Sequence, residues 1–320
     1  MFATAVTKKL GIQTPIVGGT MMYLSSPSFV AAISNAGALG VLCSAMYRDY
    51  DAFRDAIKET NDLTDKPWSC NLNLFPSMHA MDNAKLLDIL VEGGVKTIET
   101  SGHKAPEDLA KRFKDAGVTW IHKCVGLRYA KKAEALGADI VTVVGYENGG
   151  ATGTLDIGTM VLIPTVVQGL EIPVIGGGGI GTGRGLAAVL ALGAQGVIMG
   201  TRFMMSEECP IHKDLKLALA KANETETILV MRTLNNTHRL WKNNRAELIL
   251  ELEEKKAPMQ EIIQAAAGSR DREMFATGAL DVGTVSLGQG VGLLHDIKPC
   301  KDIVHDIMAE ANETIRGLAQ

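Results

Sequence analysis

The sequence predicts an α/β protein that folds as a (β/α)8 barrel, the TIM barrel, with an added C-terminal helical lobe. Eight short apolar runs alternate with amphipathic stretches between residues 15 and 200, which is typical of strands and helices joined by parallel crossovers. The last two runs end in glycine-rich turns, and barrels of this class often bind a phosphate with their last two strand–helix loops. After Phe203 the alternation stops, which marks the lobe.

The predicted strands are short runs suited to burial on both faces, at residues 15–18, 38–43, 69–74, 95–100, 118–124, 139–145, 173–177 and 196–200. The predicted helices carry apolar residues at helical spacing, at residues 26–36, 49–60, 84–92, 106–116, 128–136, 159–169 and 184–192. Eight such units favour a closed barrel over an open doubly wound sheet.

The last third of the chain predicts the lobe and the return to the barrel. Residues 213–222, 224–234, 243–254 and 258–267 are expected to form consecutive helices with no strand between them. Residues 278–292 are too rich in glycine for an isolated helix and too apolar for a solvated loop, so we expect them to pack against the barrel mouth. An amphipathic helix at 301–318 closes the structure. These patterns assign residues 1–205 and 276–320 to the barrel and 206–275 to a helical lobe covering its mouth.

Composition narrows the class of protein. The chain has 320 residues, of which 46% are hydrophobic and 21% charged, so it can bury a large core without disulfides. Its five cysteines have no C-x-x-C spacing and are expected to be reduced thiols in the core. A net charge of −4 without a basic cluster argues against nucleic-acid binding, and no apolar run is long enough to span a membrane. We expect a cytoplasmic protein with no metal site and no membrane partner; a homodimer is left open.

The glycine-rich turn after the seventh strand predicts a phosphate site. Residues 172–185 run from an apolar strand into a helix start, which leaves the N–H groups of Gly178 and Gly179 free to bind an anion just beyond Gly177. The eighth strand ends at Gly200 and Thr201, which could complete the same site.

These glycines have two other possible interpretations. Gly176, Gly178 and Gly181 satisfy G-x-G-x-x-G, but a dinucleotide-binding turn needs an acidic residue about 20 positions later. No Asp or Glu occurs between Glu171 and Glu207, so that interpretation fails. Tight strand-to-helix packing alone could also explain the glycines.

Chemistry in a barrel lies where the strands end, so the residues just past each strand are the candidates for the site. Lys123 carries a full charge at the end of an apolar strand, where a cation is costly unless it meets an anion. Asn71 could both donate to and accept from a heterocycle or a ribityl chain. Met21 and Met22 could lie against a flat ring. Each also has an ordinary structural explanation: Lys123 exposed to solvent, Asn71 as a core amide and the methionines as core packing.

Seven motifs in order make the chain resemble the nitronate monooxygenase (2-nitropropane dioxygenase-like) family, which includes NADH:quinone reductases and is related to flavin-dependent enoyl-acyl-carrier-protein reductases. They are Gly18-Gly-Thr-Met21, Ile121-His-Lys-Cys124, Gly145-Tyr-Glu-Asn-Gly-Gly150, residues 175–185, Met199-Gly-Thr-Arg-Phe203, Glu208-Cys-Pro-Ile-His212 and Met231-Arg-Thr-Leu-Asn-Asn-Thr237. The resemblance implies a barrel that binds FMN, with the phosphate on Gly178, Gly179, Gly200 and Thr201. It also implies that Asn71, Lys123, Met21, Met22, Gly149 and Gly150 lie around the flavin.

One position departs from the family pattern. The family loop after strand six commonly ends in G-G-H or A-G-H, with a histidine that acts as base or proton donor beside the flavin, whereas this chain has Ala151. Losing a general base typically lowers a rate by about 10²–10⁴. Tyr146 and Glu147 on the same loop, or His295 beyond the glycine-rich return, could supply the proton, although a structural role would explain each of them as well. Lys123 is the other catalytic candidate, because its charge could stabilise an anionic reduced cofactor or an enolate-like substrate.

Three functions follow as hypotheses. The first is an FMN-dependent oxidoreductase that takes electrons from NAD(P)H and reduces a small-molecule acceptor, a quinone or an enoyl group. The second is a nitronate monooxygenase that oxidises alkyl nitronates with O₂. The third is a flavin-free barrel lyase, isomerase or ligand-binding protein that uses the phosphate site for another ligand.

Overall fold

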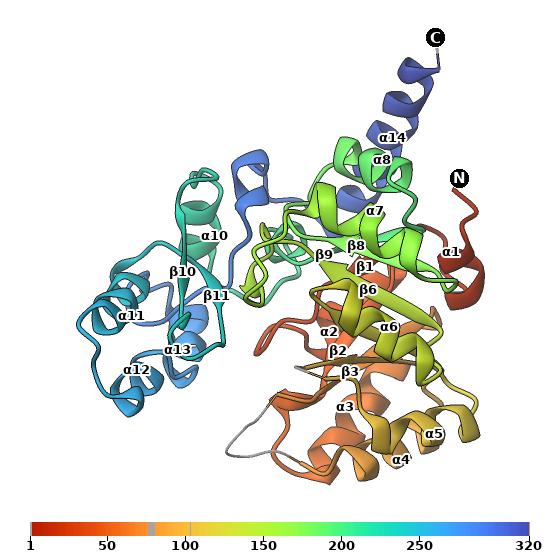
Figure 1. The fold of residues 1–320 in the computed structure, drawn as a ribbon, viewed down its shortest axis with the longest axis horizontal. Coiled ribbons are helices and arrows are strands. Elements are labelled where there is room, and N and C mark those ends of the chain that lie inside the picture. The colour runs from red at the N-terminus through yellow and green to blue at the C-terminus, as the bar shows by residue number, and fades with distance from the viewer. Residues whose placement is uncertain (1, 76–80, 103, 320) are drawn as a thin grey trace.

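The computed structural model describes residues 2–75, 81–102 and 104–319, and it confirms the TIM barrel (Figure 1). Eight parallel strands form one sheet in the order β1-β9-β8-β6-β5-β4-β3-β2. β1 and β2 close the ring, because the Gly18 N–H donates to the Leu39 carbonyl and the Leu39 N–H to the Ile16 carbonyl, both at 2.9 Å. All eight match predicted strands; their bounds are β1 Ile16–Gly18, β2 Gly40–Cys43, β3 Trp68–Asn73, β4 Thr97–Ser101, β5 Thr119–Cys124, β6 Ile140–Val144, β8 Val174–Gly177 and β9 Gly196–Met199.

Helices between the strands cover the outside of the barrel, as predicted. Side-chain caps fix several of their first turns: Asp49 accepts from the Ala52 N–H at 2.8 Å, and Thr182 accepts from the Gly185 N–H at 3.2 Å. The helices are α2 Pro27–Asn35, α3 Tyr50–Leu63, α4 Asn83–Glu92, α5 Glu107–Asp115, α6 Leu127–Ala135, α7 Thr159–Gly169 and α8 Gly183–Ala191.

The barrel has an inner and an outer core, because successive side chains of a strand point to opposite faces. On β5, Trp120 packs in the outer cluster beneath the helices, whereas Ile121 belongs to the inner cluster. Helix α1 (Ala5–Leu10) contributes Val6 and Leu10 to that inner cluster. Apolar side chains thus fill much of the inside of the barrel, and the charged residues Glu99 and Lys123 also face inward, on β4 and β5.

The prediction of an all-helical lobe is wrong in one segment. Residues 224–234 were expected to form a helix, but the structure has β10 (Thr227–Val230), which pairs with β11 (His238–Trp241) in an antiparallel hairpin. The run Thr-Ile-Leu-Val favours a strand, and the left-handed φ of Met231, 58°, ends any continuation as a helix. A two-residue strand from the barrel loop, β7 (Gly150–Ala151), completes this three-stranded sheet.

The rest of the lobe is helical and lies beside the barrel (Figure 1). Its helices are α10 Lys213–Leu219, α11 Asn244–Glu254, α12 Met259–Ala265 and α13 Ser269–Thr277, so α13 runs across the predicted boundary at residue 275. The division at residues 205 and 275 stays a prediction.

The glycine-rich return packs against the barrel mouth, as expected. Gly288 donates its N–H to Thr201 Oγ1 at 3.1 Å, and Gln289 donates its N–H to the Glu147 carbonyl at 3.0 Å. The chain then forms α14 (Cys300–Leu318), which lies along α8 (Figure 1). Within the described residues, no helix is long and apolar enough to cross a membrane.

Candidate active site

A cavity of about 900 Å³ opens at the carboxyl ends of the barrel strands. Barrel loops contribute Lys123 and Gly179 to its lining, and the lobe contributes His238 and Asp271. Its volume is near the upper end of the ~300–1,000 Å³ usual for ligand pockets, so a cofactor and part of a second molecule can share it.

Almost all the predicted cofactor residues meet in this cavity. Those that line it are Met21, Met22, Asn71, Lys123, Gly149, Gly150, Gly178, Gly179, Gly200 and Thr201. Gly177 is not among the lining residues: it ends β8, and a Cβ there would lie 3.1 Å from Val144 Cγ1 and still closer to Ile198. Its lack of a side chain therefore serves packing inside the barrel.

The loop after β8 has the form of an anion-binding cradle. Gly178 and Gly179 have φ values of +100° and +73°, which L side chains rarely adopt. A Cβ on Gly178 would lie 2.7 Å from Thr159 Oγ1 and 2.8 Å from the Gly145 nitrogen, so the loop fits only glycine. Within the described part of the chain, the N–H groups of Gly178, Gly179 and Ile180 donate to no protein acceptor. Such unpaired amides at the start of a helix suit a phosphate.

Thr201 adds a hydroxyl to the same side of the cavity. Its Oγ1 accepts the Gly288 N–H, so the hydroxyl hydrogen can still donate to an anion. The cradle, the end of β9 and the glycine-rich return are thus joined at one place, although they are far apart in sequence.

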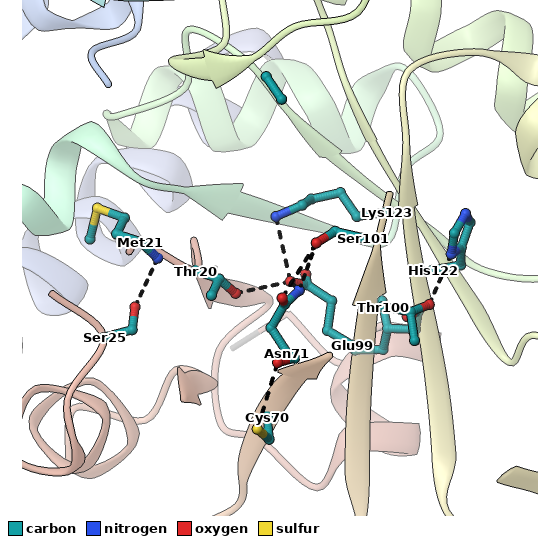
Figure 2. A network of polar contacts seen from close by, with 12 residues as sticks. Thr20, Met21, Ser25, Cys70, Asn71, Glu99, Thr100, Ser101, His122 and Lys123 are labelled. Carbon is teal, nitrogen blue, oxygen red and sulfur yellow. Dashed lines mark hydrogen bonds and ion pairs between the residues drawn. The ribbon is translucent and has the colours of Figure 1, made fainter. Parts of the chain in front are cut away.

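The structure also reveals a buried carboxylate that sequence reasoning missed. Glu99 on β4 is 1% exposed, and its Oε1 accepts hydrogen bonds from Thr20 Oγ1 at 2.9 Å and from Asn71 Nδ2 at 2.7 Å (Figure 2). Lys123 Nζ lies 3.5 Å from the same oxygen, and the lysine side chain is 22% exposed. A buried carboxylate is costly without a counter-charge, so Glu99 and Lys123 stabilise each other and hold the ammonium at the cavity wall.

A simple signal in the sequence would have found Glu99. Neighbouring strands pair Asn71 with Glu99, and Ser101 with Lys123, so alternation places all four on the inner face. Glu99 lies two residues before the end of β4, as Asn71 does on β3, yet only Asn71 was among the predicted site residues.

Tyr146 and Glu147 were expected to be catalytic, but the structure places neither among the cavity-lining residues. Glu147 caps α7, since its carboxylate accepts from the Thr159 N–H at 2.9 Å and from Thr159 Oγ1 at 2.7 Å. The Arg239 guanidinium lies 4.5 Å above the Tyr146 ring and donates to the Tyr146 carbonyl at 2.9 Å. Both residues therefore have structural partners that direct them away from the cavity.

We expect Glu147→Gln to lower stability rather than impair chemistry. The amide keeps one acceptor for the Thr159 N–H but loses the charge at the helix N-terminus, a change worth about 1 kcal/mol. Thermal unfolding should report the loss, while the rate of flavin reduction per bound FMN stays within twofold of wild type. A large fall in that rate at unchanged FMN content would restore Glu147 as a catalytic candidate.

His122, His295 and the cysteines near the barrel mouth are poorly placed, or have unsuitable pKa values, for proton transfer in the cavity. Burial lowers the pKa of His122 to about 4, and its Nδ1 lies 2.9 Å from Thr100 Oγ1, so the ring is neutral at pH 7 and absent from the cavity lining. Burial raises the pKa of the Cys43 thiol to about 11 and that of Cys124 to about 12. All five cysteines are free and buried, as expected. His295 is exposed, lies 3.3 Å from the Ala220 carbonyl through Nδ1, and does not line the cavity.

Comparison with known proteins gives the family. The family model for nitronate monooxygenase matches residues 3–310. The chain belongs to the nitronate monooxygenase family. Among solved structures, FabK from Thermotoga maritima has a TM-score of 0.91 and 33% identity, over 100% of this chain and 99% of that one.

Two curated members of the family illustrate its range. The "(3aS,4S,5R,7aS)-5-hydroxy-7a-methyl-1-oxo-octahydro-1H-indene-4-carboxyl-CoA dehydrogenase" of Rhodococcus jostii (strain RHA1) is 33% identical, over 98% of this chain and 97% of the relative. A probable nitronate monooxygenase of Bacillus subtilis (strain 168) is 32% identical, over 70% of this chain and 74% of the relative. The protein is therefore an oxidoreductase of this family, for which FMN is the typical cofactor.

Proposed function

We propose that this protein is an FMN-dependent oxidoreductase that takes electrons from NAD(P)H and reduces the activated C=C bond of an enoyl thioester. The observation that carries the proposal is one cavity of about 900 Å³ that joins an anion cradle, a cation and room for a second molecule. A quinone is the other conjugated acceptor that fits this description.

The residues present fit FMN. Gly178, Gly179 and Thr201 would hold the phosphate, because their groups are free to donate and a side chain at Gly178 would obstruct the loop. Lys123 would donate to the polar edge of the ring, Asn71 would accept from it through Oδ1, and Met21 would contact its face. Bound FMN supplies two-electron redox chemistry.

The side chains of the site have separate tasks in this proposal. Lys123 provides positive charge where negative charge develops during reduction, and Glu99 holds the ammonium in place. Asn71 donates Nδ2 both to Glu99 and, at 3.1 Å, to Ser101 Oγ, which fixes the amide. The lobe and the glycine-rich return line one side of the cavity, where they would limit the access of water.

The substrate class rests on two full-length resemblances. FabK, an enoyl-acyl-carrier-protein reductase, matches essentially the whole chain, and the Rhodococcus relative is named for a carboxyl-CoA substrate. Both names refer to acyl thioesters, as enoyl-acyl-carrier protein or as carboxyl-CoA. An acyl thioester is therefore preferred to a quinone.

Nitronate oxidation with O₂ is the second candidate, because the family and several relatives carry that name. Oxidation of a neutral nitroalkane would first require removal of a proton from carbon, and Ala151 cannot do this, so another group of the cavity would have to act as the base. A preformed nitronate needs no such base.

Anaerobic mixing of the FMN-loaded protein with NADH or NADPH separates the two candidates. The reductase predicts rapid bleaching of the flavin band, followed by recovery of the band when crotonyl-CoA is added. A band that persists with both nucleotides, together with O₂ consumption on a propyl nitronate, would establish the second candidate instead. Heat-denatured protein with the same free FMN serves as the control.

A further inference from the structure

The hairpin of the lobe places a histidine directly opposite Ala151. The register of the small sheet pairs His238 of β11 with Ala151 of β7, and Arg239 with Gly150. The Thr152 N–H donates to the Thr237 carbonyl at 3.1 Å, which makes 152 and 237 a hydrogen-bonded pair. Ala151 and His238 are then the adjacent non-hydrogen-bonded pair, in which side chains share a face and lie closest, with Cα atoms about 4.5 Å apart.

That shared face belongs to the cavity. Both Ala151 and His238 line it, whereas Arg239, the next residue on β11, points to the other face and contacts Tyr146. Because the methyl group of Ala151 is small, the imidazole has space over it. A histidine at 151 and one at 238 would compete for the same volume.

The position and tautomer of the His238 ring are fixed locally. Its Nδ1 lies 2.7 Å from the Asn236 carbonyl, and since a carbonyl only accepts, Nδ1 carries a hydrogen in either protonation state. Nε2 is therefore the nitrogen that gains or loses a proton. Buried Glu253 holds the turn of the hairpin, accepting from the Thr233 N–H at 2.9 Å and from Thr233 Oγ1 at 2.6 Å.

The other ionisable side chains of the cavity are less suited to deliver a proton. Lys123 lies on β5 beside Glu99, and Asp271 lies on α13, where it accepts from the Thr284 N–H at 2.7 Å and from Thr284 Oγ1 at 3.0 Å. The register places His238, and neither of these two residues, opposite Ala151. The remaining ionisable lining residues are Tyr23, Cys43, Cys124 and Tyr129, and burial raises the pKa of the Cys43 thiol to about 11 and that of Cys124 to about 12. The other described histidines, His122, His212, His295 and His305, do not line the cavity, and His79 and His103 lie outside the described residues.

We propose that His238 is a catalytic residue that donates the proton to the acceptor carbon, supplied by the lobe rather than by the barrel loop; this rests on the proposed reductase function. Reduction of an enoyl thioester adds a hydride to Cβ and a proton to Cα. NAD(P)H is the source of the hydride and is oxidised to NAD(P)⁺. The imidazolium of His238 gives its Nε2 proton to Cα, becomes neutral imidazole and regains a proton from solvent.

Stopped-flow measurement of the two half-reactions tests the proposal. In His238→Gln we expect flavin reduction by NADH and the Kd for FMN to stay within twofold of wild type. Reoxidation of the dithionite-reduced protein by crotonyl-CoA should slow by about 100-fold. The double variant Ala151→His/His238→Gln moves the imidazole to the facing position. Its reoxidation by crotonyl-CoA should be at least tenfold faster than that of His238→Gln. His305→Gln is the matched control, since that side chain is 80% exposed on α14.

Two outcomes would overturn the role of His238 and leave the proposed reductase function intact. One is reoxidation by crotonyl-CoA at the wild-type rate in His238→Gln; another is a loss of that rate in His79→Gln or His103→Gln alone. If instead crotonyl-CoA fails to reoxidise even the reduced wild type, the reductase function fails.

A second readout does not depend on turnover. In the spectrum of protein labelled with ¹⁵N-histidine, the ring signal that disappears in His238→Gln should shift when butyryl-CoA, a saturated product analogue, saturates the FMN-loaded wild type. The His305 signal should not move. An unmoved His238 signal with butyryl-CoA bound would place the imidazole away from the acyl group and overturn the proposal.

Discussion

Replacing Gly179 with aspartate should abolish retention of FMN. The residue has a φ of +73°, and a Cβ there would lie 3.1 Å from the Cβ of Glu147. An aspartate adds strain and crowding, and it places a second carboxylate next to Glu147, in a cradle that would hold a phosphate. We expect the Kd for FMN to rise by at least 100-fold, which corresponds to about 3 kcal/mol. Flavin absorbance after gel filtration and fluorescence titration measure the change.

Gly117→Asp is a matched control for the strain. Gly117 has a φ of +65°, and a Cβ there would meet nothing within 4 Å. This variant should lose about 1 kcal/mol of stability and keep its FMN. Gly179→Ala separates strain from charge and should weaken FMN less than the aspartate does. If Gly179→Asp bound FMN within tenfold of wild type, the phosphate would not lie at this loop.

The barrel could be predicted because its physics is local. Each strand is a short apolar run, each helix has an apolar face, and the order of the elements leaves few topologies for a parallel sheet. The cradle was equally accessible: Gly178 and Gly179 adopt backbone angles that favour glycine, and the sequence shows a glycine at each position.

What the sequence could not reveal depends on pairing between distant segments. Ala151 and His238 are 87 positions apart, and nothing in either segment alone indicates that they face one another. The helix expected at 224–234 was wrong because the run Thr227–Val230 gains its strand partner only when the hairpin forms and docks on β7. Tertiary context here decides between two local conformations.

Glu99 is an intermediate case. Its alternation within β4 predicts an inward side chain, yet an inward glutamate looks unfavourable until its partners are known. Those partners come from three other places in the chain: Thr20, Asn71 and Lys123. The sequence alone predicts that the Glu99 side chain points into the barrel. Only the fold shows which residues offset the cost of burying its carboxylate.

Lys123→Met should destabilise the protein and make the flavin harder to reduce. The change leaves the Glu99 carboxylate 1% exposed with only neutral donors, and breaking a buried ion pair in this way costs about 3–5 kcal/mol. We expect the lower end, about 3 kcal/mol, because Lys123 is 22% exposed and its Nζ lies 3.5 Å from Oε1. Loss of a positive charge beside the ring disfavours electron gain, so the two-electron potential should fall; about 30 mV corresponds to about 1.4 kcal/mol.

Glu99→Gln completes a double-mutant cycle that isolates the pair. Alone it should lower stability less than Lys123→Met does, since the partly exposed ammonium can turn to water in the cavity, and it should raise the flavin potential. In Lys123→Met/Glu99→Gln the buried charge is gone, so stability should recover by about 1–3 kcal/mol relative to Lys123→Met. The potential should stay below that of Glu99→Gln. Urea unfolding and a redox titration measure both quantities. Additive stability losses would mean that the 3.5 Å contact carries no coupling, and Lys123 would then act on the flavin without help from Glu99.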